Sequence, residues 1–276
     1  MPDLMCLFWT TAGIFPLEAE TSPYSFKDRV EAAARAGFKG IGLWHSDLEL
    51  TMQRHGLPEM KRILDDNGMR HLELEFLTDW FVDGEKKRAS DRRKKLLLEA
   101  SAALHAHHVK MGDFDNTPYE FPRVVEAFAA LCADAAAFGA TIGFELMPSS
   151  MIHSLPEAIS LVEEAGAANG GLILDIAHVG TLGISCHDIQ RIPRGKLICV
   201  ELNDGTVPGS PRHDPSRARR FCGEGDFDIK GFIQCVRSTG YDGPWALEVF
   251  SKELTTLPLE QLSERAFATT ISQFKD

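Results

Sequence analysis

The sequence has no apolar run long enough to cross a membrane. A helix that spans a bilayer needs about 20 consecutive apolar residues, and nothing in the 276 residues approaches that length. The run Leu4–Trp9 near the N-terminus is also too short for the core of a signal peptide, and no basic residue precedes it. We therefore expect a cytoplasmic protein with no membrane partner.

The sequence also lacks paired cysteines and an excess of basic residues. No C-x-x-C pair occurs among the six scattered cysteines, which are Cys6, Cys132, Cys186, Cys199, Cys222 and Cys235. This spacing argues against a disulfide framework or a thiolate zinc site, and it favours cysteines that act as small core residues. The formal net charge of −11 disfavours a nucleic acid as a partner, because phosphate binding depends on a basic face.

No apolar run is followed by a G-x-G-x-x-G turn, so a dinucleotide-binding fold has little support. What recurs instead is a short apolar run, a polar loop and an amphipathic stretch. The predicted strands are Met5–Thr10, Gly40–Trp44, His71–Leu77, His108–Gly112, Thr141–Met147, Gly171–Ile176, Leu197–Leu202 and Pro244–Phe250.

Amphipathic stretches between these runs predict helices. They are Phe26–Ala36, Pro58–Asn67, Asp91–Leu104, Pro122–Phe138 and Leu155–Ala165. Four of the five are followed directly by a glycine, which is typical of a helix C-terminus. Eight strand–helix units in a chain close to the ~250 residues of common barrels predict an α/β fold, a single (β/α)8 TIM barrel over residues 1–276.

Carboxylates lie at the C-terminal ends of the last four predicted strands, where barrel enzymes carry their chemistry. The four residues are Glu145, Asp175, Glu201 and Glu248. Each interrupts an apolar run, and a charge there is costly to bury unless it is paired or binds a metal. Four oxygen ligands favour Mn²⁺ or Mg²⁺ over Zn²⁺. The alternative is four unrelated carboxylates, each paired with a Lys or Arg at the rim.

The chain resembles the xylose isomerase-like TIM barrels, which include sugar epimerases, sugar-phosphate isomerases, inosose dehydratases, dehydroshikimate dehydratases and endonucleases. The resemblance covers nearly the whole chain and is strongest in Gly143–Pro148, Asp175–His178, Glu201–Asp204, Gly223–Asp226 and Gly240–Pro244. It implies one divalent metal ion, with Co²⁺ or Zn²⁺ as further options, held by Glu145, Asp175, position 201 and Glu248. Glu201 stands where the family has His or Gln, and an alignment shifted by two residues would place Cys199 there instead.

The resemblance implies that Glu145 and Glu248 are the catalytic pair. One removes a carbon-bound proton beside a metal-held carbonyl, and the other returns a proton to the enediolate, as in a sugar isomerase or epimerase. A dehydratase (lyase) of a cyclic substrate, such as an inosose or 3-dehydroshikimate, is the alternative. An endonuclease is disfavoured by the acidic composition, and a sugar-binding barrel without catalysis remains a further alternative.

The charge of the predicted centre bears on the substrate. Four carboxylates around one divalent ion leave a net charge of roughly −2. This favours an uncharged sugar or cyclic polyol over a dianionic phosphate. The resemblance also makes a homo-oligomer, a dimer or a tetramer, an expectation.

Two regions of the sequence are predicted by resemblance to contact the substrate. His178 stands three residues after Asp175, as in the family's D-x-x-H motif. His213 and Arg220 lie on the long loop after the strand Leu197–Leu202, and similar loops in the family bring an Arg to the substrate. The alternative for His178 is a rim histidine bonded to a backbone carbonyl.

Four further residues, at the ends of the first four strands, are predicted to bind the substrate, with Glu75 contacting a hydroxyl group and Lys110 a hydroxyl group or a carboxylate. Glu75 is nearest the mouth among the alternating polar residues of its strand, and Lys110 ends the fourth strand. Trp9 and Trp44 end the first two strands, where aromatic side chains often form the walls of sugar pockets. A solvated lysine and ordinary packing of the two tryptophans are the alternatives.

Overall fold

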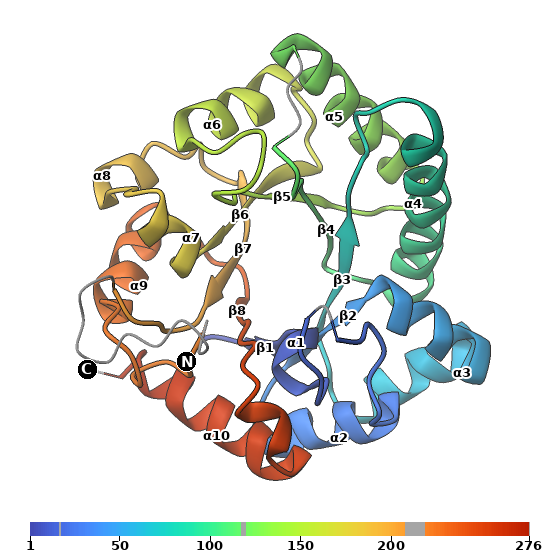
Figure 1. The fold of residues 1–276 in the computed structure, drawn as a ribbon, viewed down its shortest axis with the longest axis vertical. Helices are drawn as coiled ribbons and strands as arrows, with labels where there is room; N and C mark the ends of the chain where they lie inside the picture. The colour runs from blue at the N-terminus through green and yellow to red at the C-terminus, as the bar shows by residue number, and fades with distance from the viewer. Residues whose placement is uncertain (17, 117–119, 208–218, 276) are drawn as a thin grey trace.

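The fold is a closed barrel of eight parallel strands surrounded by helices, as the sequence predicts (Figure 1). A computed structural model describes residues 1–16, 18–116, 120–207 and 219–275. The strands pair in chain order, and the last one pairs with the first. They are β1 (Leu4–Cys6), β2 (Gly40–Trp44), β3 (His71–Leu77), β4 (His108–Met111), β5 (Ile142–Glu145), β6 (Gly170–Asp175), β7 (Leu197–Leu202) and β8 (Trp245–Leu247).

The helices that cover the barrel include all five predicted stretches. They are α1 (Phe8–Thr11), α2 (Phe26–Ala36), α3 (His45–Asp66), α4 (Gly84–Leu104), α5 (Phe121–Ala136), α6 (Leu155–Glu164), α7 (Ile176–Thr181), α8 (Cys186–Ile189), α9 (Ile229–Ser238) and α10 (Leu259–Ser272), with a 3₁₀ turn η1 (Leu254–Thr256). No helix in the described part of the chain is long and apolar enough to cross a membrane.

Several element boundaries differ from the prediction, and among them α4 begins at Gly84 rather than Asp91 and β8 ends at Leu247 rather than Phe250. The predicted helix Pro58–Asn67 is only the second half of α3, and the chain turns at Gly56 (φ 71°) between the halves. The first predicted strand ends early, because β1 stops at Cys6 and α1 follows at once. All four residues of α1 are buried. A strand and a helix cannot be told apart in a short buried apolar run, which explains why the first strand was predicted too long.

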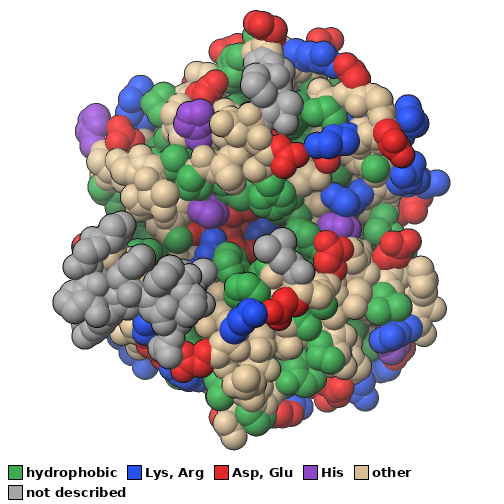
Figure 2. Space-filling view, in the orientation of Figure 1, with side chains coloured by type: hydrophobic (Ala, Val, Ile, Leu, Met, Phe, Trp, Pro, Cys, Tyr) green, Lys and Arg blue, Asp and Glu red, His purple; other side chains and the backbone are tan. Residues whose placement is uncertain are grey.

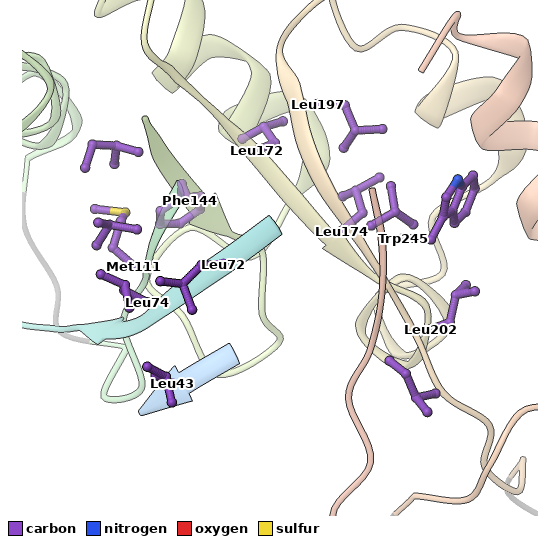
Figure 3. Close-up of a cluster of buried hydrophobic side chains, with 14 of the residues drawn as sticks. Leu43, Leu72, Leu74, Met111, Phe144, Leu172, Leu174, Leu197, Leu202 and Trp245 are labelled. Carbon is purple, nitrogen blue, oxygen red and sulfur yellow. The ribbon is translucent and has the colours of Figure 1, made fainter. Parts of the chain in front are cut away.

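The core lies between the strands and the surrounding helices. Figure 3 shows part of it, including Leu72 and Leu74 of β3 beside Met111 and Phe144 of the next strands. Because side chains alternate along a strand, Glu73 and Glu75 point to the other side of β3, into the barrel. A separate apolar cluster of Met5, Leu7, Ile173, Cys199 and Ala246 is also buried. The strands therefore carry apolar residues outward and, from β3, charged residues inward.

One disulfide contradicts the prediction, drawn from the cysteine spacing, that the cysteines are unpaired core residues. Cys186 of α8 is bonded to Cys235 of α9. These two residues are 49 positions apart, so only the folded chain brings them together. The other four cysteines are free and buried, in agreement with their predicted role in the core.

A buried ion pair ties α2 to α3. The Arg29 guanidinium contacts the Asp47 carboxylate, and their side chains are only 1% and 4% exposed. Asp47 also accepts a hydrogen bond of 2.8 Å from the backbone N–H of Ser22. Arg29 lies over the ring of Phe8, 5.3 Å from its centre. Loss of either charge would leave the other buried without its partner, which is costly.

We predict that Arg29→Met lowers the free energy of unfolding by about 3–5 kcal/mol, because Asp47 keeps its charge in a buried position. Urea unfolding measures the change. Arg35→Met on the same helix is the matched control, since Arg35 is 57% exposed in its pairs with Glu31 and Glu260 and should contribute less than about 1 kcal/mol. Equal losses in the two variants would contradict the prediction.

Candidate functional site

A cavity of about 700 Å³ opens at the C-terminal end of the barrel. Figure 2 shows acidic, basic and histidine side chains at the bottom of the central hollow. The apolar part of the lining consists mainly of Trp9, Trp44, Phe76, Phe114, Met147 and Phe250. The ionisable part includes Glu75, Lys110, Glu145, His178, Arg219 and Glu248. The cavity thus combines an aromatic wall with a charged floor.

The four predicted carboxylates converge beneath this cavity. Glu145 and Asp175 end β5 and β6, and the sheet register pairs Asp175 with Glu201 of β7. Glu248 directly follows β8. All four residues are buried, and one oxygen from each lies within 4.8 Å of the others. Cys199, the alternative for position 201, is grouped with Glu73 and His108 instead.

Asp175 is held in place by the start of α7. Its Oδ1 accepts hydrogen bonds from the backbone N–H groups of Ala177, at 2.7 Å, and His178, at 3.3 Å, which is the usual role of Asp at a helix N-cap. Its Oδ2 accepts a 2.8 Å hydrogen bond from the Asn203 amide. The sequence reasoning missed Asn203. Its position two residues after Glu201, on the same side of an extended chain, was the available signal.

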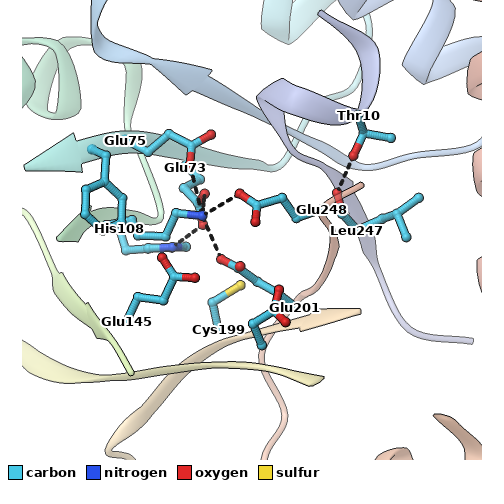
Figure 4. A network of polar contacts seen from close by, with 12 residues as sticks. Thr10, Glu73, Glu75, His108, Glu145, Cys199, Glu201, Leu247 and Glu248 are labelled. Carbon is cyan, nitrogen blue, oxygen red and sulfur yellow. Dashed lines mark hydrogen bonds and ion pairs between the residues drawn. The ribbon is translucent and has the colours of Figure 1, made fainter. Parts of the chain in front are cut away.

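Lys110 occupies the barrel interior next to the carboxylates and is only 1% exposed. Its Nζ lies 2.9 Å from oxygens of Glu75 and Glu201, and 3.1 Å from oxygens of Glu73 and Glu248 (Figure 4). Burial alone would lower the pKa of Lys110, but the charges of Glu201 and Glu248, with those of Glu73 and Glu75, raise it well above its usual value. Lys110 and Glu75 both line the cavity, but protein carboxylates already surround the lysine.

The arginine that reaches the site is Arg219 rather than the predicted Arg220. The Arg219 Nη1 lies 3.1 Å from Asp175 Oδ2 and also contacts the Glu248 carboxylate. Its guanidinium lies over the Phe250 ring, 4.2 Å from the centre. Arg220 forms a β-bridge with Asp204 and is absent from the described lining of the cavity. Neighbouring residues of an extended segment point to opposite sides, so only one of the two arginines faces the cavity.

The remaining predicted residues take different positions. His178 lines the cavity, with Nε2 3.4 Å from Glu145 Oε1. Burial would lower the pKa of His178, but the charges of Asp175 and Glu145 raise it above its usual value. Trp9 and Trp44 form part of the wall, with ring centres 5.0 Å apart. His213 lies outside the described residues.

The charges of the site leave room for a cation. Six buried carboxylates, namely Glu73, Glu75, Glu145, Asp175, Glu201 and Glu248, face two buried basic residues, Lys110 and Arg219. In the described part of the chain, Glu201 Oε2 has no hydrogen-bond partner although it is buried. Burial also raises the pKa of Glu201 well above its usual value. An all-oxygen donor set with a surplus of negative charge fits a divalent cation.

The titration of Glu75 leads to a prediction about pH. Burial, opposed by the charge of Lys110, raises the pKa of Glu75 to about 8. A carboxyl with a raised pKa holds its proton more tightly in the folded protein, so its contribution to stability is lost as the pH rises towards 8. In metal-free protein, Glu75→Gln should therefore flatten this decline, by at most about 1.4 kcal/mol per pH unit.

Urea unfolding at a series of pH values between about 5 and 8 measures the effect. Glu163→Gln, at an exposed position of α6, is the control and should keep the wild-type slope. A slope in Glu75→Gln that matches wild type would show that Glu75 does not titrate in this range.

Comparison with known proteins gives similarity to enzymes of several kinds. The chain is 28% identical to a 3-dehydroshikimate dehydratase of Pseudomonas aeruginosa over 239 residues, 84% of this chain and 37% of that protein. It is 24% identical to an inosose isomerase of Halalkalibacterium halodurans over 80% of each chain. The chain thus spans little more than a third of the dehydratase and most of the inosose isomerase.

Solved structures show the same fold. The IOLI protein, solved with a zinc atom, has a TM-score of 0.85 at 19% identity and covers 99% of this chain and 98% of its own. A D-psicose 3-epimerase solved with D-fructose has a TM-score of 0.75 at 16% identity and covers 99% of both chains. A family model for the xylose isomerase-like TIM barrel matches residues 30–272. On that match and the barrel itself, the chain belongs to the xylose isomerase-like TIM barrel family.

Proposed function

We propose that this protein is a divalent-metal-dependent isomerase or epimerase that acts on an uncharged ketose or keto-polyol. The observation that carries the proposal is the grouping of Glu145 and Glu248, which line the cavity, with the buried carboxylates of Asp175 and Glu201. The similarity to an inosose isomerase over most of both chains supports the same class of reaction.

The lining of the cavity favours an uncharged substrate. Trp9 and Trp44, with the other aromatic residues of the wall, offer apolar faces to the C–H groups of a sugar or cyclic polyol. Lys110 and Arg219 are the Lys and Arg side chains of the described lining, and protein carboxylates bind both. An anionic substrate would have to compete with those carboxylates. Hydroxyl groups can instead bond to His178, which lines the cavity and is partly exposed.

Glu145, Asp175, Glu201 and Glu248 would hold the metal ion. A divalent cation bound there would polarise a substrate carbonyl and so acidify the neighbouring C–H group. Burial raises the pKa of Glu248, but Lys110 and Arg219 outweigh it and bring the pKa to about 2. Glu248 is thus ionised at neutral pH and able to accept a proton. Glu145 lies against His178, which can exchange protons with it.

The two glutamates come from different strands, β5 and β8, and so reach the substrate from different sides. One carboxylate takes the proton from the C–H bond, which leaves an enediolate. The other delivers a proton to the opposite face of the same carbon, giving an epimer. Alternatively it delivers the proton to the adjacent carbon while the hydroxyl proton passes to the former carbonyl oxygen, giving an aldose–ketose isomer.

The metal centre is tested by the metal content of purified protein. We expect about one divalent ion per chain, Mn, Mg, Co or Zn, by mass spectrometry. Glu201→Gln and Glu248→Gln should each weaken binding at least about tenfold, because each removes a charged ligand. Glu163→Gln on the outer surface should leave it unchanged. Wild-type protein that contains no metal and gains no thermal stability from any divalent ion would overturn the proposed centre.

The reaction is tested by proton exchange in deuterium oxide. Mn²⁺-loaded protein should incorporate deuterium into a ketohexose or an inosose while it forms an isomer, as observed by NMR. Glu145→Gln and Glu248→Gln should slow this exchange by about 10²- to 10⁴-fold, since each removes a proton-transfer group. Glu163→Gln serves again as the control. Exchange at the wild-type rate in both site variants would exclude them as the catalytic pair.

A dehydratase is the second candidate, because the chain is similar to 3-dehydroshikimate dehydratases over more than four-fifths of its length. Such an enzyme would begin with the same removal of a proton and then expel a β-hydroxyl group. The same experiment separates the two reactions. A dehydratase releases water and forms a conjugated product that absorbs in the ultraviolet. An isomerase or epimerase releases no water and forms no such product.

A further inference from the structure

Lys110 is an unusual residue for the inside of a barrel. Barrel interiors are mostly filled by branched apolar side chains, and burial of an ammonium group is costly unless it is well paired. Lys110 is 1% exposed, and its Nζ has carboxylate oxygens of four residues within 3.1 Å. Lys110 therefore contacts four of the six buried carboxylates of the site.

The four carboxylates around Lys110 fall into two pairs. Glu201 and Glu248 belong to the group of four carboxylates that forms the proposed metal centre, whereas Glu73 is grouped with His108 and Cys199. Glu73 and Glu75 of β3 do not belong to the group of four. Figure 4 shows the carboxylates of both pairs converging from different strands. Lys110 is thus paired on one side with residues of the proposed metal centre and on the other with Glu73 and Glu75.

The second pair is itself fixed in position. The Glu73 Oε2 lies 2.7 Å from His108 Nε2, and His108 Nδ1 lies 2.9 Å from His107 Nδ1. Both Glu73 and His108 are fully buried. Because one oxygen of Glu73 is bound by His108, its other oxygen is directed at Lys110, at 3.1 Å. This chain of contacts anchors the ammonium group from below.

Glu201 connects the lysine with the proposed metal. Its Oε1 lies 2.9 Å from Lys110 Nζ, whereas its buried Oε2 has no hydrogen-bond partner in the described part of the chain. One oxygen is therefore satisfied by the lysine and the other is available to a cation. Glu248 likewise gives Oε1 to Lys110, at 3.1 Å, and directs Oε2 to the side of Asp175 and Arg219.

We propose that Lys110 is a permanent internal cation of the metal centre, a positioning residue that shares Glu201 and Glu248 with the divalent ion. Without the ion, Lys110 offsets the repulsion among the buried carboxylates and keeps them in place. A divalent ion would find the Glu201 oxygen that Lys110 does not contact free to bind it, so this ligand would need little rearrangement. The proposal rests on the metal centre of the proposed function and assigns Lys110 a role other than substrate binding.

The test compares Lys110→Met with Lys196→Met by thermal unfolding in a chelator. Lys196 is a matched control because its half-buried ammonium binds the backbone carbonyls of Ala167 and Gly170, and no carboxylate contact is recorded for it among the described residues. Because Lys110→Met lacks the internal cation, its Tm should lie about 6–20 °C below that of wild type. Mn²⁺ should then raise the Tm of Lys110→Met more than that of wild type, because the added ion replaces the lost charge.

A second variant keeps the test decisive if Lys110→Met does not fold. Lys110→Met/Glu201→Gln removes the lysine together with one carboxylate charge, and it should recover part of the lost Tm. A merely structural lysine would predict no such rescue and no larger response to Mn²⁺. The proposal is overturned if metal-free Lys110→Met loses no more stability than Lys196→Met, if the double variant is not rescued, or if Mn²⁺ stabilises Lys110→Met no more than wild type.

The outcome for wild type separates this proposal from the proposed function. If no divalent ion stabilises wild type, the metal centre itself is wrong. If Mn²⁺ stabilises wild type and the Lys110 variants behave like the control, the centre stands and only the shared role of Lys110 fails.

Discussion

The structure depends on how the barrel keeps six carboxylates buried within a small volume. Each ionised carboxylate loses its hydration when it is buried, and each repels its neighbours. Lys110 and Arg219 supply the positive charge, from β4 and from the loop after β7. Two cations do not balance six carboxylates, so the remaining negative charge is what a divalent ion would offset. Burial raises the pKa of Glu201 well above its usual value, which shows that its ionised form is costly in this position.

The closed parallel sheet explains why these charges can meet at all. Parallel strands in register bring their C-terminal ends to one rim, so residues far apart in sequence lie side by side, as Asp175 and Glu201 do. Alternation along β3 then directs Glu73 and Glu75 inward while Leu72 and Leu74 pack outside. The start of α7 adds the backbone N–H groups that fix Asp175. A rigid scaffold therefore sets the spacing of the carboxylates before any ligand binds.

The sequence predicts the barrel and the four grouped carboxylates because both depend on local patterns, namely strand–helix alternation and charges at strand ends. It does not predict contacts that depend on the path of a loop. Arg219 and Arg220 are adjacent in sequence, and only the direction of the chain decides which one faces the cavity. The surroundings of Lys110 could not be predicted either, because its four partners come from β3, from β7 and from the position directly after β8. The Cys186–Cys235 disulfide could not be predicted for the same reason, because it joins two helices whose cysteines are 49 residues apart in the sequence.

The charge of the centre links these findings to the substrate. From sequence, four carboxylates and one divalent ion give a net charge of roughly −2. The fold adds two carboxylates, Glu73 and Glu75, and two cations, Lys110 and Arg219, so the sum is unchanged once Glu75, whose pKa is about 8, has lost its proton. The distribution differs, because the added charges are paired with one another and with the proposed metal ligands. A phosphate would meet a floor that is negative overall, with both cations already bound. An uncharged polyol meets hydroxyl-binding carboxylates below and aromatic faces around it, which is the environment that its own surface matches.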